Sequence, residues 1–130
     1  MTHPMKRKME AARFWRDHLR DRCRRTPTTT SARRGLVAEI QLAVATYYSV
    51  PKNDLLIKTR EPHIVRPRQI AMFLARRFTR RSFPWIGERF GGMDHTTVLH
   101  SVNRIAELSL HDVELRDDLE ELSRRIVRDL

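Results

Sequence analysis

Hydrophobic residues recur at steps of three or four along most of the chain, with polar residues between them. This spacing places the apolar side chains on one face of a helix and predicts a series of amphipathic helices. The first clear stripe after residue 30 consists of Leu36, Ile40, Val44 and Tyr47. Val50-Pro51 is expected to end that helix, because the residue before a proline is driven out of the α region. No segment shows a sustained period of two, so the sequence predicts an all-α fold.

Further helices are expected downstream, separated by turn and capping residues. VPKNDLL is typical of a short connecting turn, in which Asn53 or Asp54 can cap another brief helix. The next helix is expected to begin near Pro67, after a loop rich in proline and cations. Ser82 can cap a short helix with Pro84 in its first turn, where no amide partner is lost. The apolar stripes after the connecting segment are Ile70, Leu74 and Phe78; Ile86 and Phe90; Val98, Val102, Ile105 and Leu108; and Leu115, Leu119, Leu122 and Ile126.

The N-terminal segment has a stripe of its own and is set apart by a polar linker. Residues 5–23 predict an amphipathic helix with arginines on its flanks; its apolar positions are Met5, Met9, Ala12, Trp15, Leu19 and Cys23. Three interpretations stay open: a helix packed on the main domain, a basic arm on nucleic acid, or a membrane-surface helix. RRTPTTTSARRG then breaks the periodicity and ends at a cap, Thr30 or Ser31. We expect a basic helical arm and linker over 1–30 and a small helical domain over 31–130.

Charge narrows the class of partner. The chain has 130 residues and a formal net charge of +10, mostly from arginine, which suits forked contacts with phosphate oxygens. A polyanionic partner is the leading expectation. The one cysteine cannot form an internal disulfide, which fits a reducing cytosol. No apolar run approaches the ~18 residues of a membrane span, and the first residues lack the features of a signal peptide. We therefore expect a cytoplasmic, nucleoid-associated protein without a membrane partner.

The segment FGGMDHTTVLHSVNRI, residues 90–105, concentrates the candidate chemistry. A helix, a glycine turn and a second helix form the helix-turn-helix outline, whose second helix enters the major groove with its N-terminus first. Asp94 can cap that helix by accepting the amide of Thr96 or Thr97. His95 and the two threonines then stand on the first turn, where their side chains can reach base edges. The second glycine is expected to let the turn pass close to its neighbours.

The same segment resembles the signature GGRDHTTVLHA of the C-terminal DNA-binding domain, domain IV, of the bacterial chromosomal replication initiator DnaA. Upstream, IVRPRQIAMFLARRFTRRSFPWIGERF is similar to the family pattern VxRPRQIAMYLARxxTxxSLPEIGxxF. The likeness covers about residues 36–127. It implies a small helical domain related to Trp repressor, and duplex DNA carrying a DnaA box of the type TTATNCACA as the ligand.

The resemblance also implies site residues. It assigns base readout to Asp94, His95, Thr96 and Thr97, with Pro84 on a thymine methyl and Arg60 in the minor groove. It assigns backbone contacts to Arg68, Gln69 and, through an Arg-for-Lys difference, Arg76. Arg60 has an alternative as an ordinary solvated loop cation, and Arg66 is expected to tie down the loop. Asn103 and Arg104 either touch phosphate or face solvent.

Three departures from the family pattern bear on the target. Met93 replaces the usual arginine, so we expect one cation beside the recognition turn to be missing and the salt dependence to weaken. Trp85 replaces the usual glutamate. Pro62 and His63 make the basic loop poorer in arginine. The preferred box therefore need not be the family consensus.

Other chemistries receive little support. There is no GxxxxGK[ST] phosphate loop, so we expect no ATPase in this chain. The histidines and Cys23 form no zinc-ligand set, and the neighbours Asp94, His95 and Thr96 do not by their adjacency make a catalytic triad. No enzyme activity, metal or cofactor is expected. Leu119, Leu122 and Leu130 are candidates for a helix-pairing seam.

The sequence thus predicts sequence-specific binding of double-stranded DNA at DnaA-box-like sites, through a helix-turn-helix and a basic loop. We expect a replication-origin or transcription regulator without ATPase activity, as a monomer or weak dimer. Two alternatives remain: a protein-interaction module that binds the replication machinery, and a nonspecific basic nucleic-acid binder.

Overall fold

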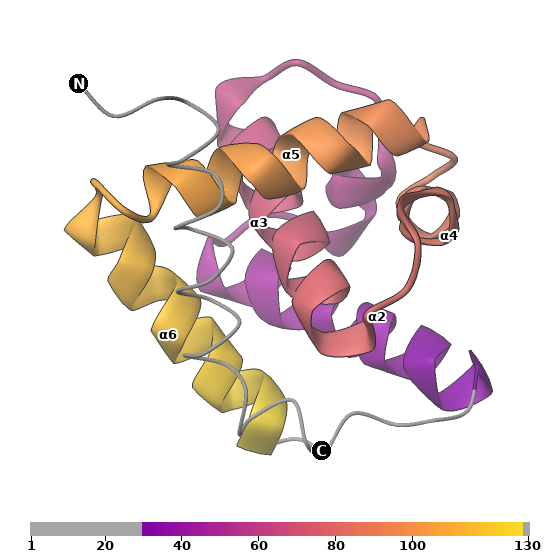
Figure 1. Cartoon of the computed structure of the whole chain (residues 1–130), viewed down its shortest axis with the longest axis horizontal. Coiled ribbons are helices and arrows are strands. Elements are labelled where there is room, and N and C mark those ends of the chain that lie inside the picture. Colours follow the sequence, from indigo (N-terminus) through magenta and orange to yellow (C-terminus); the bar gives the residue numbers. More distant parts are fainter. Residues whose placement is uncertain (1–29, 129–130) are drawn as a thin grey trace.

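The computed structural model describes residues 30–128, which form helices and no strand within that range (Figure 1). The elements are α2 (Thr30–Tyr47), the 3-10 helix η2 (Lys52–Leu56), α3 (Pro62–Thr79), α4 (Phe83–Arg89), α5 (His95–Leu108) and α6 (Val113–Arg128). The predicted all-α fold is confirmed. The helix predicted over 5–23 lies outside the described residues.

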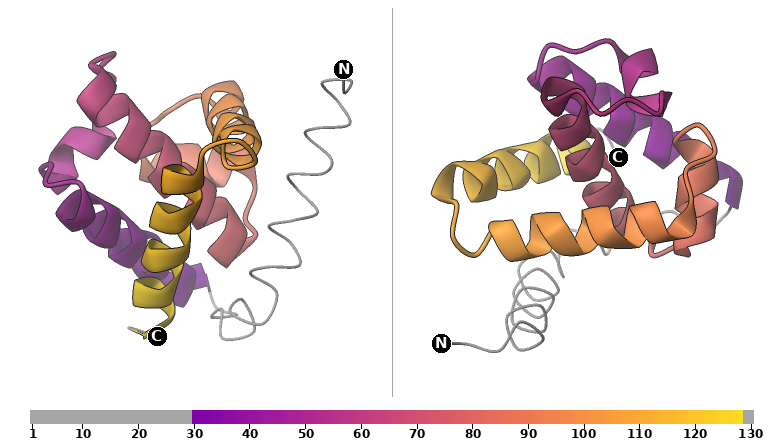
Figure 2. Two further views of the ribbon diagram at one scale, coloured as in Figure 1. Left: turned by 90° about the vertical axis from the view of Figure 1, so that its left-hand side faces the viewer. Right: turned by 90° about the horizontal axis from the view of Figure 1, so that it is seen from above.

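Helix α3 is the centre of the domain. Its middle is buried almost without interruption, and Ile70, Phe73, Leu74 and Phe78 have no exposed surface. It contacts α2, η2, α4, α5 and α6. Figure 1 shows α5 passing over α3, with α4 at one end of α5 and α6 at the other, and Figure 2 shows the same arrangement from two further sides. The predicted apolar stripes are therefore confirmed as faces packed on one core.

The start of α3 differs from the prediction. The helix begins at Pro62, not near Pro67, because a proline at the first helical position loses no amide partner. The amides of Ile64 and Val65 both reach the Glu61 carbonyl, at 2.9 and 2.8 Å, and close the first turn. Pro67 is buried inside the helix. The basic loop is consequently short, covering residues 57–61 between η2 and α3.

Two of the predicted caps are confirmed and two are wrong. The Ser82 hydroxyl accepts the Trp85 amide at 3.3 Å, and the Asp94 carboxylate accepts the Thr96 amide at 2.9 Å. η2 starts after Pro51 without a side-chain cap, so the prediction of a cap at Asn53 or Asp54 is wrong; both residues lie within the 3-10 helix. The described part of α2 starts at Thr30, so Thr30 and Ser31 are helical residues and not caps.

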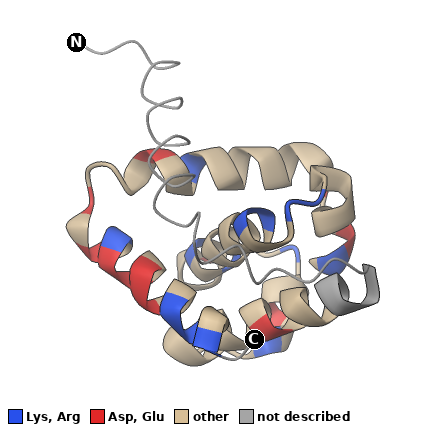
Figure 3. Cartoon of the chain, turned by 60° about the horizontal axis from the view of Figure 1, so that its bottom comes forward, with Lys and Arg blue, Asp and Glu red and all other residues tan. Residues whose placement is uncertain are grey.

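Helix α6 is attached to the end of α2 by a tyrosine pair. The hydroxyls of Tyr47 and Tyr48 donate to the two oxygens of Asp118, at 2.6 and 2.9 Å. The bond to Asp118, followed by burial, raises the pKa of Tyr47 to about 12, and burial together with the Asp118 bond raises the pKa of Tyr48 further. Leu119 and Leu122 are fully buried in this packing, so they do not provide the predicted helix-pairing seam. Acidic residues predominate in the first part of α6, and basic residues gather toward its C-terminal end (Figure 3).

Candidate nucleic-acid interface

Helices α4 and α5 meet at a tight turn that depends on Gly87. The Met93 amide donates to the Gly87 carbonyl at 2.9 Å, and the Phe90 amide donates to the same oxygen at 3.1 Å. A Cβ on Gly87 would lie 2.1 Å from the Met93 carbonyl oxygen, far inside van der Waals contact. Only glycine therefore allows the turn to fold back so closely on α4.

Both glycines of the turn take the left-handed conformation, with φ of 76°. Gly91 is the one in close approach: a Cβ there would lie 1.9 Å from the Leu56 carbonyl oxygen. A Cβ on Gly92 would meet nothing within 4 Å. The close approach expected of the second glycine is thus made by the first, and it joins the turn to the end of η2, next to the basic loop.

The first turn of α5 is exposed and ordered by its cap. One oxygen of Asp94 accepts both the amide and the hydroxyl of Thr96, at 2.9 and 2.8 Å, and lies 3.2 Å from Nδ1 of His95. The amide bond first, and then the hydroxyl bond, hold the pKa of the Asp94 carboxyl below its ordinary value. Asp94, His95, Thr96 and Thr97 are all exposed. The side chains predicted to read bases are therefore accessible and not part of the core.

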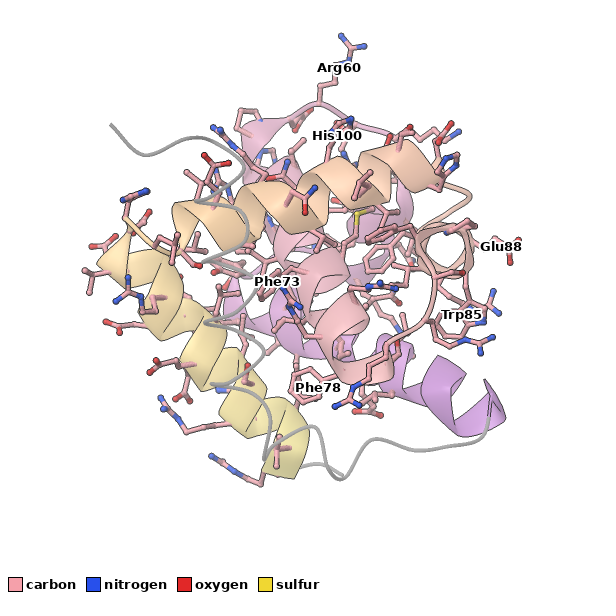
Figure 4. The ribbon with its side chains drawn as sticks, in the orientation of Figure 1. Arg60, Phe73, Phe78, Trp85, Glu88 and His100 are labelled. Atoms are coloured by element: carbon pink, nitrogen blue, oxygen red, sulfur yellow. The ribbon has the colours of Figure 1, made fainter. Side chains whose placement is uncertain are left out.

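Arg60 lies on the basic loop beside this turn. Its side chain is exposed and extends away from the body of the protein, on the same side as His100 of α5 (Figure 4). An open hollow of about 250 Å³ joins the loop to the recognition helix; its lining residues are Lys58, Thr59, Arg60, Arg68, Met93, Asp94 and Thr97. Lys58 was missed by sequence reasoning, although its place in the same short loop was a usable signal.

Arg68 lies beneath the loop, with 8% of its surface exposed. Its Nη1 donates to the Ile57 carbonyl at 2.6 Å and its Nη2 to the Thr59 carbonyl at 3.2 Å. Burial lowers the pKa of its guanidinium. Arg68 therefore holds the loop that carries Arg60. The sequence interpretation gave that task to Arg66, which is exposed.

The remaining predicted contacts flank the recognition helix. Gln69 is half-buried and lines a second hollow of about 480 Å³ on the outer side of α5, together with Thr97, His100, Ser101, Asn103, Arg104 and Glu107. Arg76 lies 4.5 Å over the Phe83 ring, and its Nη1 donates to the Arg81 carbonyl ahead of α4. Pro84 is exposed on α4.

Met93, at the position of the family's arginine, is buried in the turn and does not extend into solvent as a surface cation would. It is 8% exposed and packs on the core cluster, against which Trp85 is also partly packed. The methionine therefore contributes apolar packing at the position where the family pattern has a charge.

The fold and the site define a small helix-turn-helix domain with an exposed, capped recognition turn and a basic loop anchored beside it. The family model described as the bacterial DnaA protein helix-turn-helix matches residues 37–105. The chain belongs to this DnaA C-terminal helix-turn-helix family, as the motif resemblance predicted.

The individual relatives agree. The chain is 51% identical over 90 residues to the chromosomal replication initiator protein DnaA of Rhodopseudomonas palustris (strain BisB5), covering 69% of this chain and 19% of that protein. It is 53% identical over 90 residues to the protein of the same name from Bartonella quintana (strain Toulouse), covering 69% and 18%. The chain thus spans about a fifth of the length of the curated relatives it matches.

A solved structure titled as a DNA replication initiation factor superposes with a TM-score of 0.68 at 28% identity, covering 75% of this chain and 30% of that chain. Among residues 30–128, no helix has both the length and the apolar character that crossing a membrane requires. In the same range no three His, Cys, Asp or Glu side chains gather as a metal site.

Proposed function

We propose that this domain binds double-stranded DNA sequence-specifically at DnaA-box-like sites. One observation carries the proposal: the exposed first turn of α5 and the loop residue Arg60 border the same hollow, although they come from separate segments. A duplex can then meet both at once, with α5 in the major groove and Arg60 in the neighbouring minor groove.

The proposed roles follow the exposed chemistry. Asp94, His95, Thr96 and Thr97 face base edges, with Thr97 free of the Asp94 cap and Pro84 reaching a thymine methyl from α4. Each good base contact contributes roughly 1–3 kcal/mol of discrimination.

The proposed backbone contacts are made by Gln69 and Arg76, while Arg68 acts mainly by holding the loop. Arg76 presents a charge near the start of α4, where phosphates would pass. In the cell, occupancy of such sites would regulate a replication origin or a promoter by competition or by recruitment. The proposal gives this domain a binding role and no catalytic one.

Fluorescence anisotropy with a DnaA-box duplex and a scrambled duplex of the same composition, both at 150 mM salt, tests this function. We expect tighter binding to the box, by roughly tenfold for each 1.4 kcal/mol of discrimination. His95→Ala and Thr96→Ala should reduce the preference. His111→Ala is the matched control, because His111 is exposed in the turn that follows the C-terminal end of α5. Equal affinity for the two duplexes would refute specificity.

Two other outcomes identify the rival functions. A steep salt dependence without any preference among sequences would indicate a nonspecific nucleic-acid binder. Capture of a replication protein that survives His95→Ala and Arg60→Ala, without measurable DNA affinity, would indicate a protein-interaction module.

A further inference from the structure

One side of α4 carries a stack of two arginines on a tryptophan. Trp85 and Arg89 are four residues apart on α4, and Arg81, four residues before Trp85, lies just ahead of the helix N-cap Ser82. The guanidinium carbon of Arg81 lies 5.0 Å from the centre of the Trp85 ring system, and that of Arg89 lies 4.8 Å from it. A single indole therefore orders two cations, one toward each end of the short helix.

The ring, and not a set of carboxylates, holds these cations. The Nε atoms of both arginines are buried without a hydrogen-bond partner. Within residues 30–128 the one ion pair that either makes joins Arg89 to Glu88, at 3.7 Å, and the Glu88 side chain is 70% exposed. Residues 76–89 contain five arginines and one glutamate. Because the Arg89–Glu88 pair is solvent-exposed, the positive charge of Arg81 and Arg89 is largely uncompensated within the described residues.

The position of α4 in the motif indicates the ligand. In a helix-turn-helix the second helix enters the groove while the first crosses the sugar–phosphate backbone. Pro84, proposed to touch a base, precedes Trp85 in the first turn of α4, so the stack and a proposed base contact belong to the same short helix. Figure 4 shows Trp85 at the α4 end of the protein, away from α6.

We propose that Arg81 and Arg89 bind phosphates of the DNA strand beside α4, and that Trp85 is the residue that positions both. This proposal rests on the proposed function. It adds phosphate contacts, here called the α4 phosphate grip, that the family pattern does not contain, because that pattern has glutamate where Trp85 stands. A guanidinium stacked on a ring keeps its edge N–H groups free for phosphate oxygens. Its orientation is fixed beforehand, so less side-chain entropy is lost on binding.

A salt titration tests the two arginines. The slope of log K against log[salt] falls by about 0.9 for each phosphate contact removed. We expect Arg81→Ala/Arg89→Ala to lower it by about 1.8, on box and scrambled duplexes alike. The charge-matched control is Arg124→Ala/Arg128→Ala on α6, where Arg124 is paired with Glu121 and Arg128 is exposed; its slope should stay near wild type. A slope change no larger in the α4 pair than in the α6 pair would overturn the proposal.

Trp85 is tested by substitution and by fluorescence. Trp85→Phe keeps an aromatic face and should preserve the slope, whereas Trp85→Leu should lower it. The chain has two tryptophans, so Trp15→Phe leaves Trp85 as the only one. Its emission should change on addition of the box duplex and stay constant on addition of an acidic peptide. If Trp85→Leu does not fold, the salt slope of Arg81→Ala/Arg89→Ala and the Trp85 fluorescence still test the proposal.

The outcomes separate the two proposals. Preference for the box with a wild-type slope in Arg81→Ala/Arg89→Ala refutes the α4 phosphate grip alone. A lowered slope with no preference for the box refutes sequence specificity alone. A response of Trp85 to the acidic peptide and not to DNA would make this stack a protein-binding surface, and absence of any DNA binding refutes both proposals.

Discussion

Alanine at Gly91 should destabilise the domain far more than alanine at Gly92. The two positions share a φ of 76°, which is about 1–2 kcal/mol unfavourable for a residue with a Cβ. Alanine also lowers the conformational entropy of the unfolded chain, which stabilises the folded protein by about 0.4–1 kcal/mol and offsets part of that cost. Gly92→Ala, with open space around the new Cβ, should therefore lower the free energy of unfolding by about 0–1.6 kcal/mol.

Gly91→Ala meets an additional obstacle. Its Cβ would lie 1.9 Å from the Leu56 carbonyl oxygen, whereas ordinary contact begins at 3.4 Å, so the backbone must move by more than an ångström. Overpacking of this kind typically costs 1–3 kcal/mol. The total loss should be about 1–4.6 kcal/mol, which exceeds the Gly92→Ala loss by the overpacking cost.

Urea and thermal unfolding followed by circular dichroism measure both variants, with coincident transitions as the check on two-state behaviour. A loss of 1 kcal/mol lowers the melting temperature of a domain of this size by roughly 4–8 °C. Gly91→Ala should shift it farther than Gly92→Ala, by an amount equivalent to about 1–3 kcal/mol. Equal losses at the two glycines would show that the turn does not pack on Leu56 and would refute the reasoning.

Three further predictions concern the loop, the tyrosine pair and the cap. Arg68→Lys should weaken DNA binding, because a lysine ammonium cannot donate to the Ile57 and Thr59 carbonyls as the forked guanidinium does. If Arg68 acts through the loop, the same substitution should have only a slight effect on DNA binding in an Arg60→Ala background. Additive losses of binding free energy in this double-mutant cycle would indicate that Arg68 contacts phosphate directly. The pKa of Tyr47 is raised to about 12 and that of Tyr48 is raised further, so tyrosinate absorbance should appear only well above pH 10. The free energy of unfolding should fall as the pH rises from 10 to 12, because the unfolded chain loses these protons first. A tyrosinate titration centred at pH 10 would contradict this prediction. The pKa of Asp94 is lowered in the folded protein, so its carboxylate stabilises the fold above the ordinary pKa of 3.8, and this contribution is lost as the pH falls below that value. In Asp94→Asn the free energy of unfolding should therefore depend less on pH in that range.

Much of the fold was predictable because apolar spacing depends only on neighbours in sequence. The stripes from Leu36 to Ile126 all pack on one core, and the caps at Ser82 and Asp94 were found because a cap acts within three residues of itself. The start of α3 was missed because a proline fits the first position of a helix as well as a loop, and the choice depends on packing of the first turn.

Long-range contacts were the part that the sequence did not predict. Which glycine needs the absence of a Cβ depends on Leu56, from a segment that only the fold brings to the turn. Arg68 could not be separated from a phosphate contact by sequence, because its partners are carbonyls eleven and nine residues upstream. The Arg81–Trp85–Arg89 spacing was visible, yet the stacking of both cations on one ring appears only with the side chains in place.

The attachments of the basic loop have a consequence for the choice of DNA. Arg68 holds the loop from α3, and the close contact between Gly91 and Leu56 fixes it against the turn. The separation between Arg60 and the start of α5 is therefore set before any ligand arrives. A duplex that contacts both Arg60 and the start of α5 must twist or bend to match this fixed separation, and the stiffness of DNA varies from one base step to the next. Base pairs between the two contacts would then influence affinity without being touched by any side chain.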